Sequence, residues 1–156
     1  MVLIFQLLLI RGVSGHVITA SFLFAITNTC YMKDFWNYWH PRVLALLRMV
    51  MGFLIFWHGT QKLFGYPPSE GASGELSGLL LLAGILEFIG GILLFIGLFT
   101  NWAAFILSGT MAVAYFMVYG SISFLPIVNH GELSVIYCFV FFYLFFSGGG
   151  AWSIDN

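Results

Sequence analysis

The residues of this sequence that could do chemistry are few, and most lie inside long apolar runs. One run contains Arg48 and, further along, His58, Gln61 and Lys62. Glu87 lies near the middle of the next run. Because an ionisable side chain in hydrocarbon needs a partner, Glu87 is expected either to pair with a cation such as Arg48 or to hold a proton. Such a pair is either a structural bond that fixes helix register or part of a ligand or proton site.

A second polar group follows a later loop and contains Asn129, His130 and Glu132. These residues should lie at about the same depth as Lys62 and its polar neighbours, and together they predict an outward-facing polar site. Tyr115 lies on a stripe that could add hydroxyl groups to the same cavity. Each of these features also has a purely structural explanation. The second group could cap a helix, the Lys62 ammonium could lie at the membrane interface, and the tyrosine could serve only in packing.

Small residues accompany these polar side chains at helical spacing. A step of about 100° per residue aligns Gly52 and Gly59 with Arg48 and Lys62 on one helix face. Three further glycines flank Glu87: Gly84, Gly90 and Gly91. Since small residues let helix backbones approach closely in a membrane, we expect the two runs to pack against each other along these faces.

The composition sets the environment of these residues. Hydrophobic residues make up 61% of the 156 positions and charged residues 7%. Backbone polar groups cannot stay unpaired in lipid, so continuous apolar runs of this length predict transmembrane helices. A formal net charge of −1 offers no basic surface, and nucleic acid is not expected as a partner. The predicted partner is membrane lipid.

The runs predict an all-α membrane protein built as a four-helix transmembrane bundle. The expected helices cover about 43–64, 77–99, 102–119 and 131–147, joined at Thr100 and Asn101 by a very short turn. Lys33, Arg42 and Arg48 lie near the start of the first helix, whereas the first loop is acidic. This charge asymmetry places both ends of the four-helix core in the cytoplasm.

Residues 1–31 form an N-terminal hydrophobic extension outside the domain expected at 32–156. Its apolar runs are interrupted by Arg11, Gly12, Gly15 and His16, and no basic segment precedes them, which argues against a signal peptide. Three interpretations remain: an extra membrane helix, an interfacial segment, or sequence upstream of a natural start at Met32.

Metal and haem sites are not expected. The two cysteines, Cys30 and Cys138, are far apart and form no thiolate cluster. Haem ligation needs an inward-facing histidine, usually with a partner, and only His58 lies inside a predicted helix. No nucleotide, flavin or zinc motif is present.

The sequence resembles the DoxX family of small bacterial membrane proteins over about Leu44 to Asp155. The motifs that carry the resemblance are Arg48…Gly52…His58-Gly59-x-x-Lys62-Leu63-Phe64-Gly65, Gly84-Ile85-Leu86-Glu87-x-x-Gly90-Gly91, Gly97-Leu98-Phe99-Thr100, Asn129-x-Gly131-Glu132 and Trp152-Ser153-Ile154-Asp155. The resemblance implies a four-helix fold in the bacterial cytoplasmic membrane and favours Met32 as the start. Asn101 departs from the arginine that is frequent in the family, and Gly148 to Gly150 replace a proline-containing turn.

The family is linked to membrane oxidoreductases, and the resemblance implies an accessory subunit of a quinone-linked enzyme. In that hypothesis His58, Lys62 or Glu132 hydrogen-bonds a quinone. Whether the chain itself is an enzyme stays open. The main alternative is a non-catalytic scaffold or assembly protein, for which Glu87→Gln should lower abundance rather than turnover. A small-solute transporter is the weaker alternative, and a homo-oligomer is compatible with each.

Overall fold

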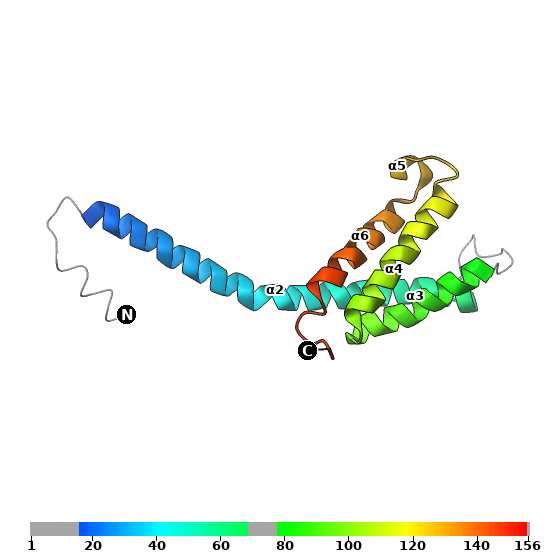
Figure 1. Cartoon of the computed structure of the whole chain (residues 1–156), viewed down its shortest axis with the longest axis horizontal. Coiled ribbons are helices and arrows are strands. Elements are labelled where there is room, and N and C mark those ends of the chain that lie inside the picture. The colour runs from blue at the N-terminus through cyan, green and yellow to red at the C-terminus, as the bar shows by residue number, and fades with distance from the viewer. Residues whose placement is uncertain (1–15, 69–77, 156) are drawn as a thin grey trace. The chain divides into compact units, whose positions relative to one another are not determined.

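The computed structural model describes residues 16–68 and 78–155, with side chains from Tyr31 onward (Figure 1). This part of the chain is helical and contains no strand. Its elements are α2 (His16–Phe64), α3 (Gly78–Ile96), α4 (Thr100–Ala114), the π-helix η1 (Tyr115–Tyr119), α5 (Pro126–Asn129) and α6 (Glu132–Ser147). The predicted all-α class is confirmed.

Three helical segments are long and apolar enough to cross a bilayer: Tyr31–Phe64, Gly78–Ile96 and Thr100–Tyr119. The fourth apolar helix, α6, has 16 residues. At 1.5 Å per residue it extends over about 24 Å, somewhat less than the hydrocarbon thickness of a typical bilayer. The four helices of the expected membrane bundle are therefore present, and the fourth is the shortest.

The chain divides into two compact units, Met1–His40 and Pro41–Asn156. In the first unit the described residues, 16–40, are helical, and the side chains from Tyr31 to His40 are exposed. The second unit contains the helix bundle. The expected helix start near 43 is wrong, because α2 is already helical at His16 and continues through Pro41. Proline inside a helix removes one hydrogen-bond donor, which membrane helices tolerate better than water-soluble ones.

The other helix boundaries differ from the prediction by only a few residues, except at the joint between α3 and α4. There α3 ends in a Schellman motif: the Leu98 N–H donates to the Leu93 carbonyl at 3.0 Å, and the Gly97 N–H donates to the Leu94 carbonyl at 3.2 Å. Gly97 has a φ of 75°, which glycine adopts without strain. The turn therefore lies at 97–99 rather than at Thr100 and Asn101. The predicted loop at 121–130 also contains a helical turn, α5, with a proline in its first turn.

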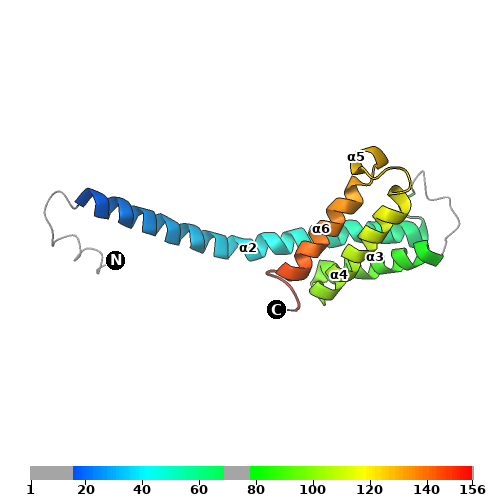
Figure 2. The ribbon, with the colours of Figure 1, turned by 45° about the horizontal axis from the view of Figure 1, so that its top comes forward.

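The core of the bundle is formed largely where α4 packs along α6, which lie side by side in both ribbon views (Figures 1 and 2). Its fully buried large side chains are Ile55, Leu94, Leu107, Phe141 and Leu144. Phe141 stacks on Tyr137 with ring centroids 5.7 Å apart. The core thus draws on every one of the four helices.

Glycines bring α2 and α3 into backbone contact, as their spacing predicts. A Cβ atom on Gly52 would lie 2.7 Å from the Phe95 nitrogen, and one on Gly59 would lie 2.5 Å from the Phe88 nitrogen. A Cβ on Gly91 would lie 2.8 Å from both the nitrogen and the Cα of Phe56. These paired contacts fix the antiparallel register of the two helices. The register in turn decides which ionisable side chains can meet.

Gly91→Ala should therefore lower the thermal unfolding temperature in detergent. The added methyl group meets backbone atoms that cannot rotate away, and overpacking of this kind costs about 1–3 kcal/mol. Gly109→Ala is the matched control, because no atom lies within 4 Å of a Cβ atom at Gly109. The control should be neutral or stabilise the helix slightly. Equal losses in both variants would contradict the close contact.

Candidate functional site

Arg48 is fully buried, but its partners are backbone carbonyls rather than Glu87. Its guanidinium donates to carbonyl oxygens at the end of α3 and in the segment after α6: those of Leu94, Phe95, Gly149 and Trp152. The expected Arg48–Glu87 ion pair is wrong. The last carbonyls of a helix lack partners within the helix and carry partial negative charge, so a guanidinium with five donors satisfies them well.

The chain after α6 completes this end of the bundle. The Asp155 carboxylate accepts from the backbone N–H groups of Phe99 and Thr100 at 2.9 and 2.8 Å, and so caps the start of α4. The Ser153 hydroxyl donates to the Gly97 carbonyl at 2.8 Å. The hydrogen bonds from the backbone N–H groups of Thr100 and Phe99, with a smaller contribution from the Arg48 charge, hold the pKa of Asp155 below its usual range. Arg48 and the segment after α6 thus hold the ends of α3 and α4 together, and their role is structural.

At the opposite end of the bundle, Lys62 in the last turn of α2 forms an ion pair with Glu87 of α3. The Glu87 side chain is fully buried, whereas the Lys62 side chain is 26% exposed. An ammonium at the end of α2 thus reaches a carboxylate well inside α3. Of the two states expected for Glu87, the structure has the one in which the carboxylate lies beside a cation, but the cation is Lys62 rather than Arg48. The interfacial position considered for the Lys62 ammonium stays a prediction.

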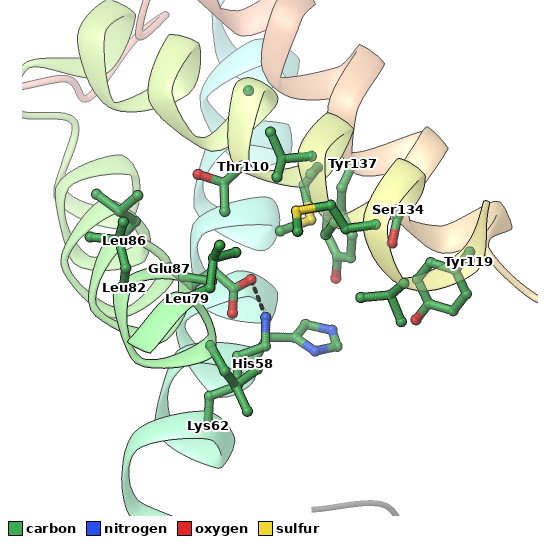
Figure 3. Close-up of a pocket in the computed structure, with 18 of the residues that line it drawn as sticks. His58, Lys62, Leu79, Leu82, Leu86, Glu87, Thr110, Tyr119, Ser134 and Tyr137 are labelled. Atoms are coloured by element: carbon green, nitrogen blue, oxygen red, sulfur yellow. Dashed lines mark hydrogen bonds and ion pairs between the residues drawn. The ribbon is translucent and has the colours of Figure 1, made fainter. Parts of the chain in front are cut away.

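The ion pair lies on the wall of a cavity of about 850 Å³ (Figure 3). Leucine, isoleucine, valine, methionine and alanine make up most of its lining. The polar lining consists of His58, Gln61, Lys62, Glu87, Thr110, Tyr119, Ser134 and Tyr137. In Figure 3 the Glu87 carboxylate lies on one side, Tyr119 and Ser134 lie on the other, and the rings of His58 and Tyr137 lie between them. An apolar cavity with a few convergent polar groups is the usual form of a small-molecule site.

One polar atom in this cavity wall lacks a partner. Lys62 binds Oε1 of Glu87, whereas Oε2 is buried and accepts no hydrogen bond. Leaving a buried acceptor unpaired costs about 1–3 kcal/mol, and more when the group is charged. The His58 ring lies edge-on to Tyr137, with ring centroids 5.8 Å apart. Glu87 therefore keeps an acceptor for a donor that the protein itself does not supply.

The remaining predicted site residues lie outside the cavity lining. Tyr115 and Asn129 are buried and hold the 121–130 loop: the tyrosine hydroxyl donates to the Phe124 carbonyl at 2.7 Å, and the Asn129 amide donates to the Ser123 carbonyl at 2.7 Å. His130 and Glu132 are exposed. The structure therefore brings together His58, Gln61, Lys62 and Glu87 of the predicted set.

The hydroxyl groups of α6 were not predicted as site residues. Tyr137 and Ser134 lie three positions apart, as residues on one helix face do, but α6 is apolar on all sides and the sequence gives no signal for its inner face. Tyr119 lies on the same predicted stripe as Tyr115 and does line the cavity, whereas the Tyr115 hydroxyl donates to the Phe124 carbonyl. Both tyrosines lie in the π-helix η1. Its closing bond runs from the Gly120 N–H to the Tyr115 carbonyl at 2.8 Å. Within the described ranges, no cluster of three or more metal-ligating side chains occurs.

Comparisons with known proteins agree with the resemblance. The model of the DoxX family matches residues 43–120. An uncharacterized protein of Haemophilus influenzae is 45% identical over 124 residues, which cover 76% of this chain and 92% of the relative. No solved structure gives a significant match. The motifs after residue 120 lie outside the match to the family model.

Asp155→Asn should remove a pH-dependent part of the stability. Because the folded pKa lies below 3.8, the usual value for an aspartate, the carboxylate stabilises the fold fully above about that pH, and this contribution is lost as the pH falls through the lower folded pKa. Unfolding temperatures in detergent should differ between wild type and variant at neutral pH and converge below pH 3.8. Asp34→Asn, the same change at an exposed residue, should give no such convergence. A constant difference down to low pH would contradict the cap.

Lys62→Met should destabilise the bundle by about 3 kcal/mol, because it leaves the buried Glu87 carboxylate without its cation. The double variant Lys62→Met with Glu87→Leu should regain most of that loss, since neither charge then remains buried. Chemical or thermal unfolding in detergent measures both. Lys33→Met at an exposed position serves as the control. Additive losses in the double variant would show that the pair is not coupled.

Proposed function

The chain belongs to the DoxX family of small membrane proteins, and from that premise we propose that it is an accessory membrane subunit that binds a quinone for a membrane oxidoreductase. The observation that carries the proposal is the buried Glu87 Oε2, which lacks a partner in an otherwise apolar cavity of about 850 Å³. This volume lies within the range of about 300–1,000 Å³ that is typical of small-molecule sites.

The cavity lining fits the chemistry of a quinone. A quinone head is a flat apolar ring with oxygen atoms on opposite edges, and its reduced form carries hydroxyl groups there. Lys62 keeps donors beyond the one that Glu87 accepts, and the His58 ring can donate or accept. Glu87 Oε2 would accept from a hydroxyl group of the reduced form. The apolar side chains of Leu86 and Met111 would contact the ring.

We propose the bacterial cytoplasmic membrane as its location, with both ends of the four-helix core in the cytoplasm. Lys33 and Arg42 lie before most of the bundle in the sequence, whereas Glu70 and Glu75 lie between the residues of α2 and those of α3. Arg48 adds nothing to this argument, because its charge is buried among carbonyls. In this orientation the cavity lies in the outer half of the bilayer. The bundle would then present its quinone site away from the cytoplasm.

The proposal is tested by purifying the protein in mild detergent and measuring the quinone that it retains after lipid extraction and mass analysis. Wild type should retain quinone, and Glu87→Gln should retain about tenfold less, because a charge-assisted hydrogen bond is worth about 1.5–3 kcal/mol. Glu132→Gln is the matched control, since this carboxylate is exposed and does not line the cavity. It should retain as much as wild type.

Two results would contradict the proposal. One is a wild-type protein that retains no quinone while its partner enzyme reduces quinone equally well without it. The other is a Glu87→Gln protein that retains quinone normally and is only less abundant in the membrane, which a scaffold or assembly function predicts.

A further inference from the structure

The cavity is bounded by α3 and α4, which are joined at one end and separate toward the other. The joint at 97–99 holds the two helices together beside Arg48, and both ribbon views show them diverging from it (Figures 1 and 2). Where they separate, both helices contribute lining residues, among them Leu79 and Leu82 of α3 and Val113 of α4, with Met117 of η1. The cavity therefore occupies the space between the diverging helices.

The side chains at this boundary face outward as well as into the cavity. Leu82 is 56% exposed and Met117 is 57% exposed, and both line the cavity. In a membrane such exposed apolar surface lies against acyl chains rather than water. The boundary between α3 and α4 is thus an opening toward lipid.

Small residues keep this opening wide. Gly109 of α4 lines the cavity and is exposed, and a Cβ atom there would meet nothing within 4 Å. Ala83 of α3 and Ala114 of α4 line the same cavity. This glycine differs from Gly52, Gly59 and Gly91, whose missing side chains let backbones touch. It lies beside open space that a ligand can occupy.

The cavity is also polarised along its length. Its charged groups, Lys62 and Glu87, lie on α2 and α3, whereas its wall at α4 and η1 carries no charge: Gly109, Val113 and Met117 are apolar there, and Thr110 and Tyr119 add only hydroxyl groups. An amphipathic molecule matches this arrangement, with a hydrogen-bonding head at the ion pair and an apolar tail toward α4. A water-soluble ligand has no apolar part that would fill the opening.

We infer that the ligand of this cavity is a tailed lipid-soluble molecule that enters sideways from the bilayer between α3 and α4, with its tail remaining in the opening beside Gly109. The inference rests on the proposed function and deepens it, because it assigns the entry route and the need for a tail. Closing the opening should then discriminate between ligands with the same head that differ only in their tails.

Gly109→Phe tests this directly, because no atom lies within 4 Å of a Cβ atom at this position, so the added side chain enters the open space beside it. Protein in lipid nanodiscs is mixed with a long-tailed ubiquinone or with the same dimethoxy-methyl-benzoquinone head lacking a tail, and bound quinone is measured after rapid filtration. Uptake of the tailed probe should fall about tenfold or more, whereas uptake of the head alone should change less than about twofold. Ile136→Phe, on an exposed α6 position outside the cavity lining, should change neither.

Unchanged uptake of the tailed probe by Gly109→Phe would overturn the inference, and so would equal loss of both probes. Wild type that takes up neither probe would contradict the proposed function instead. A phospholipid with a photoreactive acyl chain then decides the route separately. It should label Leu86 or Met111 in wild type and not in Gly109→Phe, and absence of that label in wild type would overturn the lateral opening.

Discussion

Ionisable side chains inside this bundle have no water to bind, so each must be satisfied by another part of the protein. Two solutions occur at opposite ends of the helix bundle. Arg48 donates to four carbonyl oxygens and ties α3 to the closing segment of the chain. Lys62 pairs with Glu87 but occupies only one of its two carboxylate oxygens. The first solution is complete and structural, whereas the second leaves an acceptor on a cavity wall.

The membrane class and the approximate helix positions follow from the sequence because hydropathy reports directly on burial in lipid. The close packing of α2 on α3 was also predictable, since Gly52 and Gly59 share a face with helical spacing. The partner of Glu87 was not predictable in this way. Depth estimated from helical rise ignores register, and the glycine contacts set Gly59 against Phe88. Glu87 therefore lies near the end of α2 that carries Lys62, and Arg48 lies at the end of α3.

Other parts of the site depended on features that a sequence does not display. Backbone carbonyls accept the Arg48 donors, and no side-chain pattern marks them. Tyr115 and Tyr119 both lie in the π-helix, but only Tyr119 lines the cavity, while the Tyr115 hydroxyl binds the 121–130 loop. The Asn129 and Glu132 motif was correctly recognised as polar, but it belongs to that loop and to the exposed start of α6. Family membership added the quinone hypothesis, and the cavity gives that hypothesis a location.

The central claim is that Oε2 of Glu87, which has no partner in the protein, accepts a hydrogen bond from a bound ligand. Infrared difference spectroscopy of the bundle in lipid, recorded with and without a reduced long-tailed quinone, measures this oxygen directly. The account predicts a ligand-induced change in the Glu87 carboxyl band, assigned by its disappearance in Glu87→Gln and its persistence in Glu132→Gln. A difference spectrum without any carboxyl band, or with a band that persists in Glu87→Gln, would contradict it.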